Sequence, residues 1–269
     1  MFDHIKFPKI PPLNKDPRYL QFAIMLSYAF TARQFFNFER SHWITATLLS
    51  WSIILDFFLG IIFYKRWIFP LAAMINAMIA SLLLDARSVY PFIFAATCAL
   101  FSKCLITYNG KHIFNPGNFG VVLTLQLLPN YATGMPHLFS GHIWPSVAHA
   151  FLGLLLILWA KQVDVVLAWL GSFLLFGFFR AFLLDTSLFH IFPIVLAPSF
   201  ILFTCNMITD PATNPKTRKW RIIYAVIIAF GDAVFRFLQI PYGNFYSLFL
   251  VCAFMPWIRK REECLLNTN

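Results

Sequence analysis

Ten apolar stretches follow one another along the chain, and no other feature constrains the fold as strongly. A helix that crosses a lipid bilayer needs about 20 mainly apolar residues. In this chain 59% of the side chains are apolar and 12% are charged, and the apolar excess runs from end to end. We therefore expect an all-α, polytopic membrane protein, with residues 1–269 forming a single transmembrane domain. The predicted spans are 19–35, 44–63, 68–84, 90–107, 115–128, 144–160, 163–184, 188–208, 221–238 and 244–258.

Basic residues are concentrated in alternate loops between these spans. With the N-terminus inside, the inner loops and the C-terminal tail contain Lys65, Arg66, Lys111, Lys161, Lys216, Arg218, Lys219, Arg221, Arg259, Lys260 and Arg261. The outer loops contain only Arg33, Arg40 and Arg87. Because positively charged loops stay in the cytoplasm, the tails 1–17 and 259–269 are predicted to be cytoplasmic, and we expect a bacterial inner membrane. This distribution also argues against nucleic acid as a partner, which needs a solvated basic face.

Two short features recur at nearly the same spacing. Gly117-Asn118-Phe119 opens the fifth span, and Gly243-Asn244-Phe245 opens the tenth, 126 residues later. Asp85 follows the third span and Asp210 follows the eighth, 125 residues later. We therefore predict two five-helix repeats, at about 18–128 and 143–258. Since five is an odd number, the repeats insert with opposite orientations, and inverted repeats place their functional site near the membrane midplane between them.

Two segments between spans are rich in residues that interrupt helices. They are residues 109–120, with the sequence NGKHIFNPGNFG, and residues 207–217, with the sequence MITDPATNPKT. Proline removes a backbone donor, and backbone groups freed at membrane depth need partners from protein, water or a ligand. A ligand site at these segments is one interpretation, and ordinary turns in the headgroup region are the other.

The same two segments resemble motifs of a known family. Residues 109–120 resemble the Asn-Pro element of the membrane subunits NqrB and RnfD, from the sodium-pumping NADH:quinone oxidoreductase and the Rnf ferredoxin complex. The second segment and the span after it are similar to a second motif of that family, with matching letters at Met207, Thr209, Asp210, Pro211, Thr213, Pro215, Arg221 and Arg236. The chain is similar to short, stand-alone relatives within that family, including those named from enediyne biosynthesis clusters. The resemblance implies ten helices in two inverted repeats and flavin-linked electron transfer within a complex of several subunits.

One departure from the family concerns the flavin. NqrB and RnfD attach FMN to the threonine of a Ser-Gly-Ala-Thr motif, whereas the nearest stretch here is Ser140-Gly141-His142-Ile143, in which isoleucine has no hydroxyl group. Thr133 lies in the same loop but in different surroundings. Covalent FMN is therefore not expected, and the alternatives are a noncovalent flavin (FMN or riboflavin), a quinone, or the loss of redox chemistry in this branch. The residues expected to bind such a cofactor are Lys111, His112, Phe114, Asn115, Asn118, Asp210, Thr213 and Asn214.

Five ionisable residues lie within the predicted spans, namely Asp56, Lys103, Arg180, Asp232 and Arg236. Each costs at least about 2.5 kcal/mol at the centre of a bilayer, so each is expected to face the bundle interior, water or a partner charge. Asp232 and Arg236 are four residues apart on one helix face and are predicted to pair. Asp56 and Arg180 lie in spans that correspond under the repeat, and we expect them to meet between the halves.

The remaining chemistry-bearing residues form no recognisable catalytic pattern. The histidines and the five cysteines lack the spacing of metal ligands, and no nucleotide-binding pattern occurs, so a soluble dehydrogenase module would come from another chain. No residue is assigned as catalytic. The favoured hypothesis is a membrane subunit that takes part in electron transport, with a noncovalent flavin and coupled ion movement. The alternatives are a small-solute transporter or channel built on the inverted repeat, and a structural subunit without redox chemistry.

Overall fold

The computed structural model describes residue 12 and residues 16–36, 42–66, 69–134 and 143–267. These residues are mostly helical, which confirms the predicted class. The helices of the first half are α1 (Arg18–Phe36), α2 (His42–Tyr64), α3 (Leu71–Leu83), α4 (Tyr90–Leu105) and α5 (Pro116–Leu127). Those of the second half are α6 (Ile143–Trp159), α7 (Val163–Leu183), η1 (Leu188–His190), α8 (Ile191–Val195), α9 (Pro198–Leu202), the π-helix η2 (Phe203–Met207), α10 (Arg218–Phe237), α11 (Gly243–Ala253) and α12 (Met255–Asn267).

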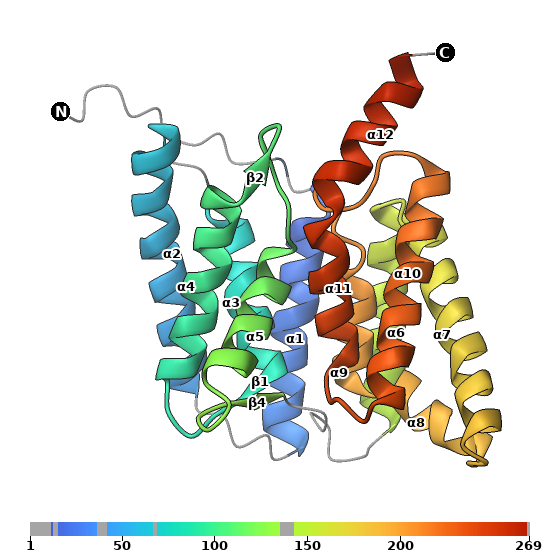
Figure 1. Cartoon of the computed structure of the whole chain (residues 1–269). Helices are drawn as coiled ribbons and strands as arrows, with labels where there is room; N and C mark the ends of the chain where they lie inside the picture. The colour runs from blue at the N-terminus through green and yellow to red at the C-terminus, as the bar shows by residue number, and fades with distance from the viewer. Residues whose placement is uncertain (1–11, 13–15, 37–41, 67–68, 135–142, 268–269) are drawn as a thin grey trace.

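Two pairs of very short antiparallel strands mark the two ends of the helical bundle (Figure 1). β2 (Thr107–Tyr108) and β3 (Lys111–His112) form a hairpin whose turn residues, Asn109 and Gly110, both have positive φ, as a two-residue hairpin turn requires. β1 (Leu84–Asp85) pairs with β4 (Thr133–Gly134) at the opposite end. We call these the hairpin end and the ladder end. α12 extends from the bundle at the hairpin end.

The predicted spans agree with single helices except in the second half. The eighth span, 188–208, is divided among η1, α8, α9 and η2, because Pro198 forces Ala197 into an extended conformation with ψ of 133°. The tenth span ends early, since α11 stops at Ala253 and α12 begins two residues later, next to Pro256. Within the described residues, α2 and α7 are long and apolar enough to cross a membrane on their own, and four shorter helices are apolar.

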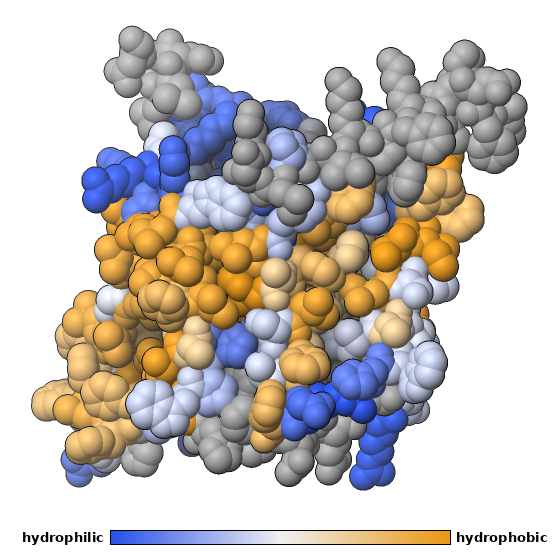
Figure 2. All heavy atoms as spheres, turned by 180° about the vertical axis from the view of Figure 1, so that it is seen from behind, coloured by the Kyte–Doolittle hydropathy of each residue, from blue (hydrophilic) through white to orange (hydrophobic). Residues whose placement is uncertain are grey.

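The outer surface of the bundle is apolar. On three different helices, large apolar side chains are more than 45% exposed, namely Phe30, Ile54, Phe58, Leu167 and Phe182. Figure 2 shows apolar side chains over much of the middle of the molecule, with hydrophilic side chains gathered mainly near its two ends. Contiguous apolar surface of this extent is unfavourable in water. It suits a protein whose sides are covered by lipid.

The helices pack as two groups that meet along the middle of the bundle. In the first group α4 lies against α2 and α5, and in the second α10 lies against α7 and α11. The groups are joined where α1 contacts α6 and where α5 contacts α11. The largest cluster of buried apolar side chains runs through both groups and includes Met78, Trp169, Phe203 and Tyr224. The two interrupted segments, 109–120 and 207–217, reach this junction from opposite groups.

Candidate functional site

The two interrupted segments meet at Asn115 and Asp210. Asn115 caps α5, because its side-chain Oδ1 accepts a hydrogen bond of 2.9 Å from the Asn118 N–H. Its Nδ2 donates to the Met207 carbonyl and to Asp210 Oδ2, both at 3.3 Å. His112 Nε2 lies 3.4 Å from the same carboxylate oxygen. The two segments therefore converge here, through the buried Asn115 and the partly buried His112 and Asp210.

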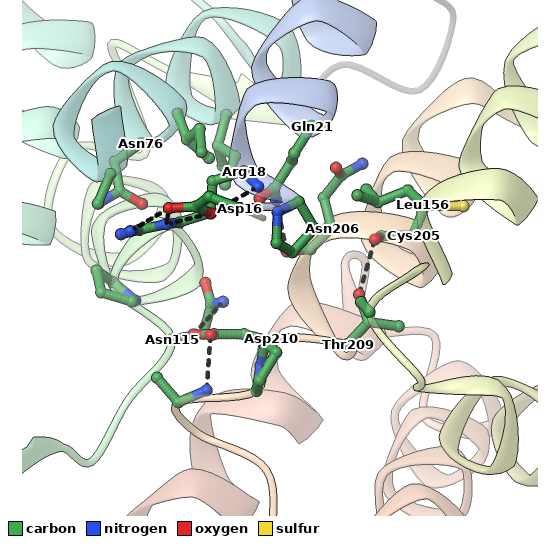
Figure 3. Close-up of a pocket in the computed structure, with 18 of the residues that line it drawn as sticks. Asp16, Arg18, Gln21, Asn76, Asn115, Leu156, Cys205, Asn206, Thr209 and Asp210 are labelled. Atoms are coloured by element: carbon green, nitrogen blue, oxygen red, sulfur yellow. Dashed lines mark hydrogen bonds and ion pairs between the residues drawn. The ribbon is translucent and has the colours of Figure 1, made fainter. Parts of the chain in front are cut away.

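A cavity of about 430 Å³ lies beside this contact, between the two helix groups (Figure 3). One wall is formed by the first turns of α1 and by α3, and another by the last turns of α6 and by η2. Its polar lining includes Asn76, His112, Asn115, Asn206 and Asp210. Apolar side chains complete the walls, among them Ile75, Ile79, Leu156 and Ile157. The cavity is thus an apolar slot with amide and carboxylate groups along part of its edge.

The π-helix η2 shapes one wall of the cavity. All five of its residues are buried, and π-helical turns are rare and occur mostly at functional sites. Asn206 lies within η2 and lines the cavity, and its Nδ2 donates to the Leu202 carbonyl at 3.2 Å. Its Oδ1 is buried and has no hydrogen-bond partner within the described part of the chain. A buried acceptor of this kind is costly unless water or a ligand supplies a donor.

Arg259 ties the two segments together at the hairpin end. One guanidinium nitrogen, Nη2, donates to the His112 carbonyl at 3.0 Å and to the Ala212 carbonyl at 2.9 Å. Nη1 lies 3.5 Å from the Lys111 carbonyl. Arg259 is only 8% exposed. Residues 259–269 were expected as a tail, but they continue as α12 up to Asn267, and this helix brings Arg259 to the site.

Glu262, one turn further along α12, holds the end of the second segment. Its carboxylate accepts hydrogen bonds from the Lys216 N–H at 3.1 Å, the Thr217 N–H at 2.8 Å and the Thr217 hydroxyl at 2.7 Å. Thr217 is the N-cap residue of α10. A buried carboxylate at a helix N-terminus is favourable, because it satisfies backbone donors that lack partners within the helix.

Three of the eight residues predicted to bind a cofactor line the cavity, namely His112, Asn115 and Asp210. Two others form contacts further from it. Phe114 stacks on Phe249 of α11 with ring centroids 4.8 Å apart. Asn118 donates through Nδ2 to the Phe245 carbonyl at 3.0 Å, a bond that joins the starts of α5 and α11.

The other three predicted residues do not line the cavity. Lys111 is exposed on the β2–β3 hairpin. Thr213 is fully buried, and its hydroxyl donates to the Asp210 carbonyl at 3.2 Å. Asn214 Nδ2 donates to Gln162 Oε1 at 3.0 Å, just before α7. Thr213 therefore stabilises the turn at Asp210, and Asn214 joins this turn to the residue that precedes α7.

The intramembrane charges pair within each helix group. Arg236 Nε donates to Asp232 Oδ2 at 2.7 Å, which confirms the predicted pair. The expected contact between Asp56 and Arg180 is wrong, because Asp56 Oδ1 is bound to Lys103 Nζ at 3.1 Å. α2 and α7, which carry Asp56 and Arg180, lie on opposite sides of the bundle (Figure 1).

Each basic side chain that lines the cavity has a carboxylate partner. Arg18 Nη2 lies 2.6 Å from Asp16 Oδ2, Lys103 is paired with Asp56, and His112 contacts Asp210. The hydrogen-bonded Arg18 guanidinium holds the pKa of the Asp16 carboxyl below its usual range. Burial by itself raises the pKa of Asp210, but the contact with His112 and the Ala212 N–H outweigh burial, so this pKa also lies below the usual range.

Sequence reasoning missed Asp16, Arg18, Arg259 and Glu262. Asp16, Arg259 and Glu262 lie in the predicted tails and Arg18 lies just before the first predicted span, and no local pattern distinguishes them from the other charged residues there. Among the described residues, no group of three or more His, Cys, Asp or Glu side chains is arranged to hold a metal ion.

Comparison with known proteins identifies the family. Residues 126–263, which make up half of the chain, match the profile of the NQR2, RnfD, RnfE family. No curated protein matches the chain. The matched region includes the Asp210 segment, Arg259 and Glu262. Asn115 precedes the matched region and belongs to the site because it is hydrogen-bonded to the Asp210 segment. The chain therefore belongs to the NQR2, RnfD, RnfE family and is an integral membrane protein of the kind that forms subunits of electron-transport complexes.

Proposed function

We propose that this protein is an electron-transport subunit that binds an uncharged, noncovalent flavin in the cavity between its helix groups. The observation that carries the proposal is the cavity beside Asn115 and Asp210. Its volume of about 430 Å³ is within the range of small-molecule sites, which are mostly apolar with a few placed polar groups. An isoalloxazine ring has this chemistry, because its faces are apolar and its edges carry hydrogen-bonding atoms. The amides of Asn76, Asn115 and Asn206 suit those edges.

The charge balance of the cavity favours riboflavin over FMN. A phosphate group needs an available cation or several backbone donors. Arg18, Lys103 and His112 line the cavity, but each already has a carboxylate partner. A phosphate would therefore have to displace a carboxylate or lie close to one. Riboflavin carries the same ring without that charge.

Covalent attachment is not part of the proposal. Residues 140–142 of the Ser140-Gly141-His142-Ile143 stretch lie outside the described residues, but Ile143 begins α6 at the ladder end. Thr133 is exposed in β4 at the same end. The cavity is toward the hairpin end, where α1 begins and α6 ends. The flavin proposed here therefore binds apart from either residue.

A matched pair of ligands tests the proposal. Purified protein would be titrated with riboflavin and with FMN, and binding followed by quenching of flavin fluorescence. We expect riboflavin to bind at least about tenfold more tightly, a difference of about 1.4 kcal/mol. The change Asp16→Asn leaves Arg18 without its carboxylate partner, so FMN should bind more tightly and the tenfold preference for riboflavin should become smaller. The control is Asp164→Asn, which breaks the ion pair between Arg221 and Asp164, whose atoms are 2.9 Å apart. Because this pair lies away from the cavity, the ratio of riboflavin affinity to FMN affinity should stay unchanged.

Two results would count against the proposal. If FMN binds as tightly as riboflavin to the parent protein, the charge argument is wrong. If neither flavin binds, the site is not a flavin site, and a small-solute transporter or a structural subunit becomes the better explanation. Loss of riboflavin binding in Asn115→Leu and Asp210→Leu would place the bound ring at the predicted segments.

We also propose the inverted-repeat architecture, with ten membrane segments and coupled ion movement. Helix pairs that correspond under the repeat both carry ionisable residues, since Asp56–Lys103 joins α2 to α4, while Arg180 is near the Asp232–Arg236 pair where α7 meets α10. α5 and α11 both open with Gly-Asn-Phe and have 12 and 11 residues. Helices of this length measure about 18 Å and are too short to cross the hydrocarbon core of about 30 Å. Interrupted helices of this kind line the sites of inverted-repeat proteins.

The orientation and partners complete the proposal. Lys65, Arg66, Lys111, Lys161 and Lys260 are all exposed and belong to loops or helices at the hairpin end. By the positive-inside rule this end faces the cytoplasm, of a bacterial inner membrane in the expected setting. Electrons would then reach the flavin from a soluble module supplied by another subunit, because the cavity lies toward the same end.

A further inference from the structure

Exposed basic side chains are concentrated on three neighbouring elements at the hairpin end. These elements are the β2–β3 hairpin, the short segment that leads into α10, and α12. We call the exposed basic residues on them the basic surface, and they are Lys111, Lys216, Arg218, Lys219, Lys260 and Arg261. Within the described part of the chain, none of them forms an ion pair with a carboxylate. Their positive charge is therefore available to a partner.

α12 fixes the three elements relative to one another. Arg259 donates to a carbonyl of the hairpin at 3.0 Å, and Glu262 accepts hydrogen bonds from two backbone N–H groups just before α10. The Asn109 amide lies 3.4 Å from Glu263 Oε1, and this contact joins the tip of the hairpin to α12. The basic side chains therefore project from one folded surface and not from separate loops.

The charge on these three elements is unbalanced. Their acidic residues are Glu262 and Glu263, which are hydrogen-bonded to the segment before α10 and to the hairpin. The N-terminal residues 1–15 contain one acid, Asp3, and three lysines. Because the proposed orientation places these residues on the same side of the membrane, their sequence adds to the positive charge of that side.

Two of the basic residues occupy a position that is unfavourable for stability. Arg218 and Lys219 begin α10, whose first turn contains no acid. The N-terminus of a helix carries a partial positive charge, so acidic residues are stabilising there and basic residues are not. Lys216 lies just before the same turn and adds to the positive potential. A surface of this kind is stabilised when a negatively charged group approaches it.

The basic surface lies beside the proposed flavin cavity and extends away from the bundle. His112, which lines the cavity, directly follows Lys111, and Arg259, which precedes Lys260, donates to the carbonyl of the cavity-lining Ala212. α12 extends past the rest of the bundle at the hairpin end (Figure 1). The positive-inside rule explains why basic residues stay in the cytoplasm, but it does not require them on a helix that leaves the bundle. That position makes them accessible to a soluble protein.

We propose that the basic surface docks an acidic face of a soluble protein, the module that supplies electrons to the cavity. The identity of the partner as an electron donor rests on the proposed function, whereas its acidic chemistry follows from the charge of the surface. Complementary charge steers two proteins together and orients them. Encounters between electron carriers have small interfaces, so a limited charged surface is sufficient for them.

Two soluble haem proteins of opposite charge serve as probes, namely cytochrome b5, which is acidic, and cytochrome c, which is basic. The full-length protein, without added flavin, would be held in phosphatidylcholine nanodiscs and titrated with each probe by surface plasmon resonance. We expect cytochrome b5 to bind and cytochrome c not to bind. Raising the ionic strength from about 0.1 M to about 1 M shortens the screening length from about 10 Å to about 3 Å, so the affinity for cytochrome b5 should fall.

Two double variants locate the contact. Lys260→Gln combined with Arg261→Gln should weaken the binding of cytochrome b5 by about fivefold, the effect of losing two exposed ion pairs of modest strength. The control is Lys65→Gln combined with Arg66→Gln. It removes the same charge from exposed residues at the same end, but next to α2 and apart from α12 (Figure 1). Its affinity for cytochrome b5 should stay close to that of the parent.

A charge reversal separates docking from folding. Lys219→Glu places an acid in the first turn of α10, where it is favourable for the helix. The variant should therefore unfold no more readily than the parent, while its affinity for cytochrome b5 falls.

The proposal is overturned if cytochrome b5 binds no more tightly than cytochrome c, if its affinity does not depend on salt, or if the two double variants lose affinity equally. It is also overturned if the variant at positions 260 and 261 loses retention of phosphatidylglycerol but keeps its affinity for cytochrome b5, since the surface would then contact lipid headgroups.

The test is independent of flavin binding. If riboflavin binds and cytochrome b5 does not, the docking surface is refuted and the flavin site stands. If cytochrome b5 binds and riboflavin does not, the flavin proposal fails, while the basic surface stands as a docking site for an acidic protein.

Discussion

Arg259 is the residue whose removal should disturb the site most, although it lies outside both predicted segments. The change Arg259→Gln removes the two short hydrogen bonds from Nη2 to the carbonyls of His112 and Ala212. A hydrogen bond to a charged group contributes about 1.5–3 kcal/mol, and glutamine can restore at most one of the two. The contact at 3.5 Å to Lys111 is at the limit of a hydrogen bond and adds little. We therefore expect the free energy of unfolding to fall by about 2–3 kcal/mol.

The assay compares variants that lie close together on α12. Denaturant unfolding in mixed micelles would be measured for Arg259→Gln, for Arg259→Lys and for Arg261→Gln. Arg261 is exposed and lies over the Trp257 ring, 5.4 Å from its centroid, so its loss should cost less than about 1 kcal/mol. Lysine at position 259 keeps the charge but cannot reproduce the geometry of the guanidinium group, and an intermediate loss is expected.

Riboflavin affinity separates a role at the site from a role in folding alone. If Arg259 positions the His112 and Asp210 segments, the Kd of the folded Arg259→Gln variant should rise, while Arg261→Gln binds like the parent. The reasoning is refuted if Arg259→Gln and Arg261→Gln lose equal stability. It is refuted in its functional part if the Arg259→Gln variant is destabilised but binds riboflavin with unchanged affinity.

Four further predictions follow from the same contacts. Because the pKa of Asp210 is lowered in the folded protein, its contribution to stability is present above the ordinary value of 3.8 and is lost as the pH falls through the lowered value; the parent should therefore be more stable than Asp210→Asn at pH 7, and this difference in the free energy of unfolding should shrink in unfolding curves measured toward pH 3. Asn115→Leu leaves the Met207 carbonyl without its donor and should cost about 1–3 kcal/mol, whereas Asn130→Leu, at an exposed position, should cost less than about 0.5 kcal/mol in the same assay. Cys264 is exposed on α12 and should react with a membrane-impermeant maleimide only from the cytoplasmic side, so labelling of intact cells at Cys264 would contradict the proposed orientation. No flavin fluorescence should remain with the denatured protein in a gel, and a fluorescent band that is lost in Thr133→Ala would show that a covalent site exists at the ladder end.

Much of the fold was predictable because its signals are local. The spans follow from continuous apolar stretches, and the helix start at Pro116 follows from Asn115, whose side chain caps it. The Asp232–Arg236 pair follows from a spacing of four residues along one helix. The interrupted segments, 109–120 and 207–217, also stand out locally, since Asn-Pro and Asp-Pro pairs within an apolar chain are unusual.

Contacts between distant parts of the chain could be decided only by the tertiary structure. Arg259 bonds to His112 across 147 residues, and no sequence pattern distinguishes it from Arg261, two positions away. Asp56 pairs with Lys103 and not with Arg180, because α2 packs against α4 and lies far from α7. Residue types and spacing determine which segments form helices and which are interrupted. Which charges meet, and therefore whether the cavity carries a free cation, depends on how those helices pack, because a side-chain pair forms only where the fold brings both partners within a few ångströms.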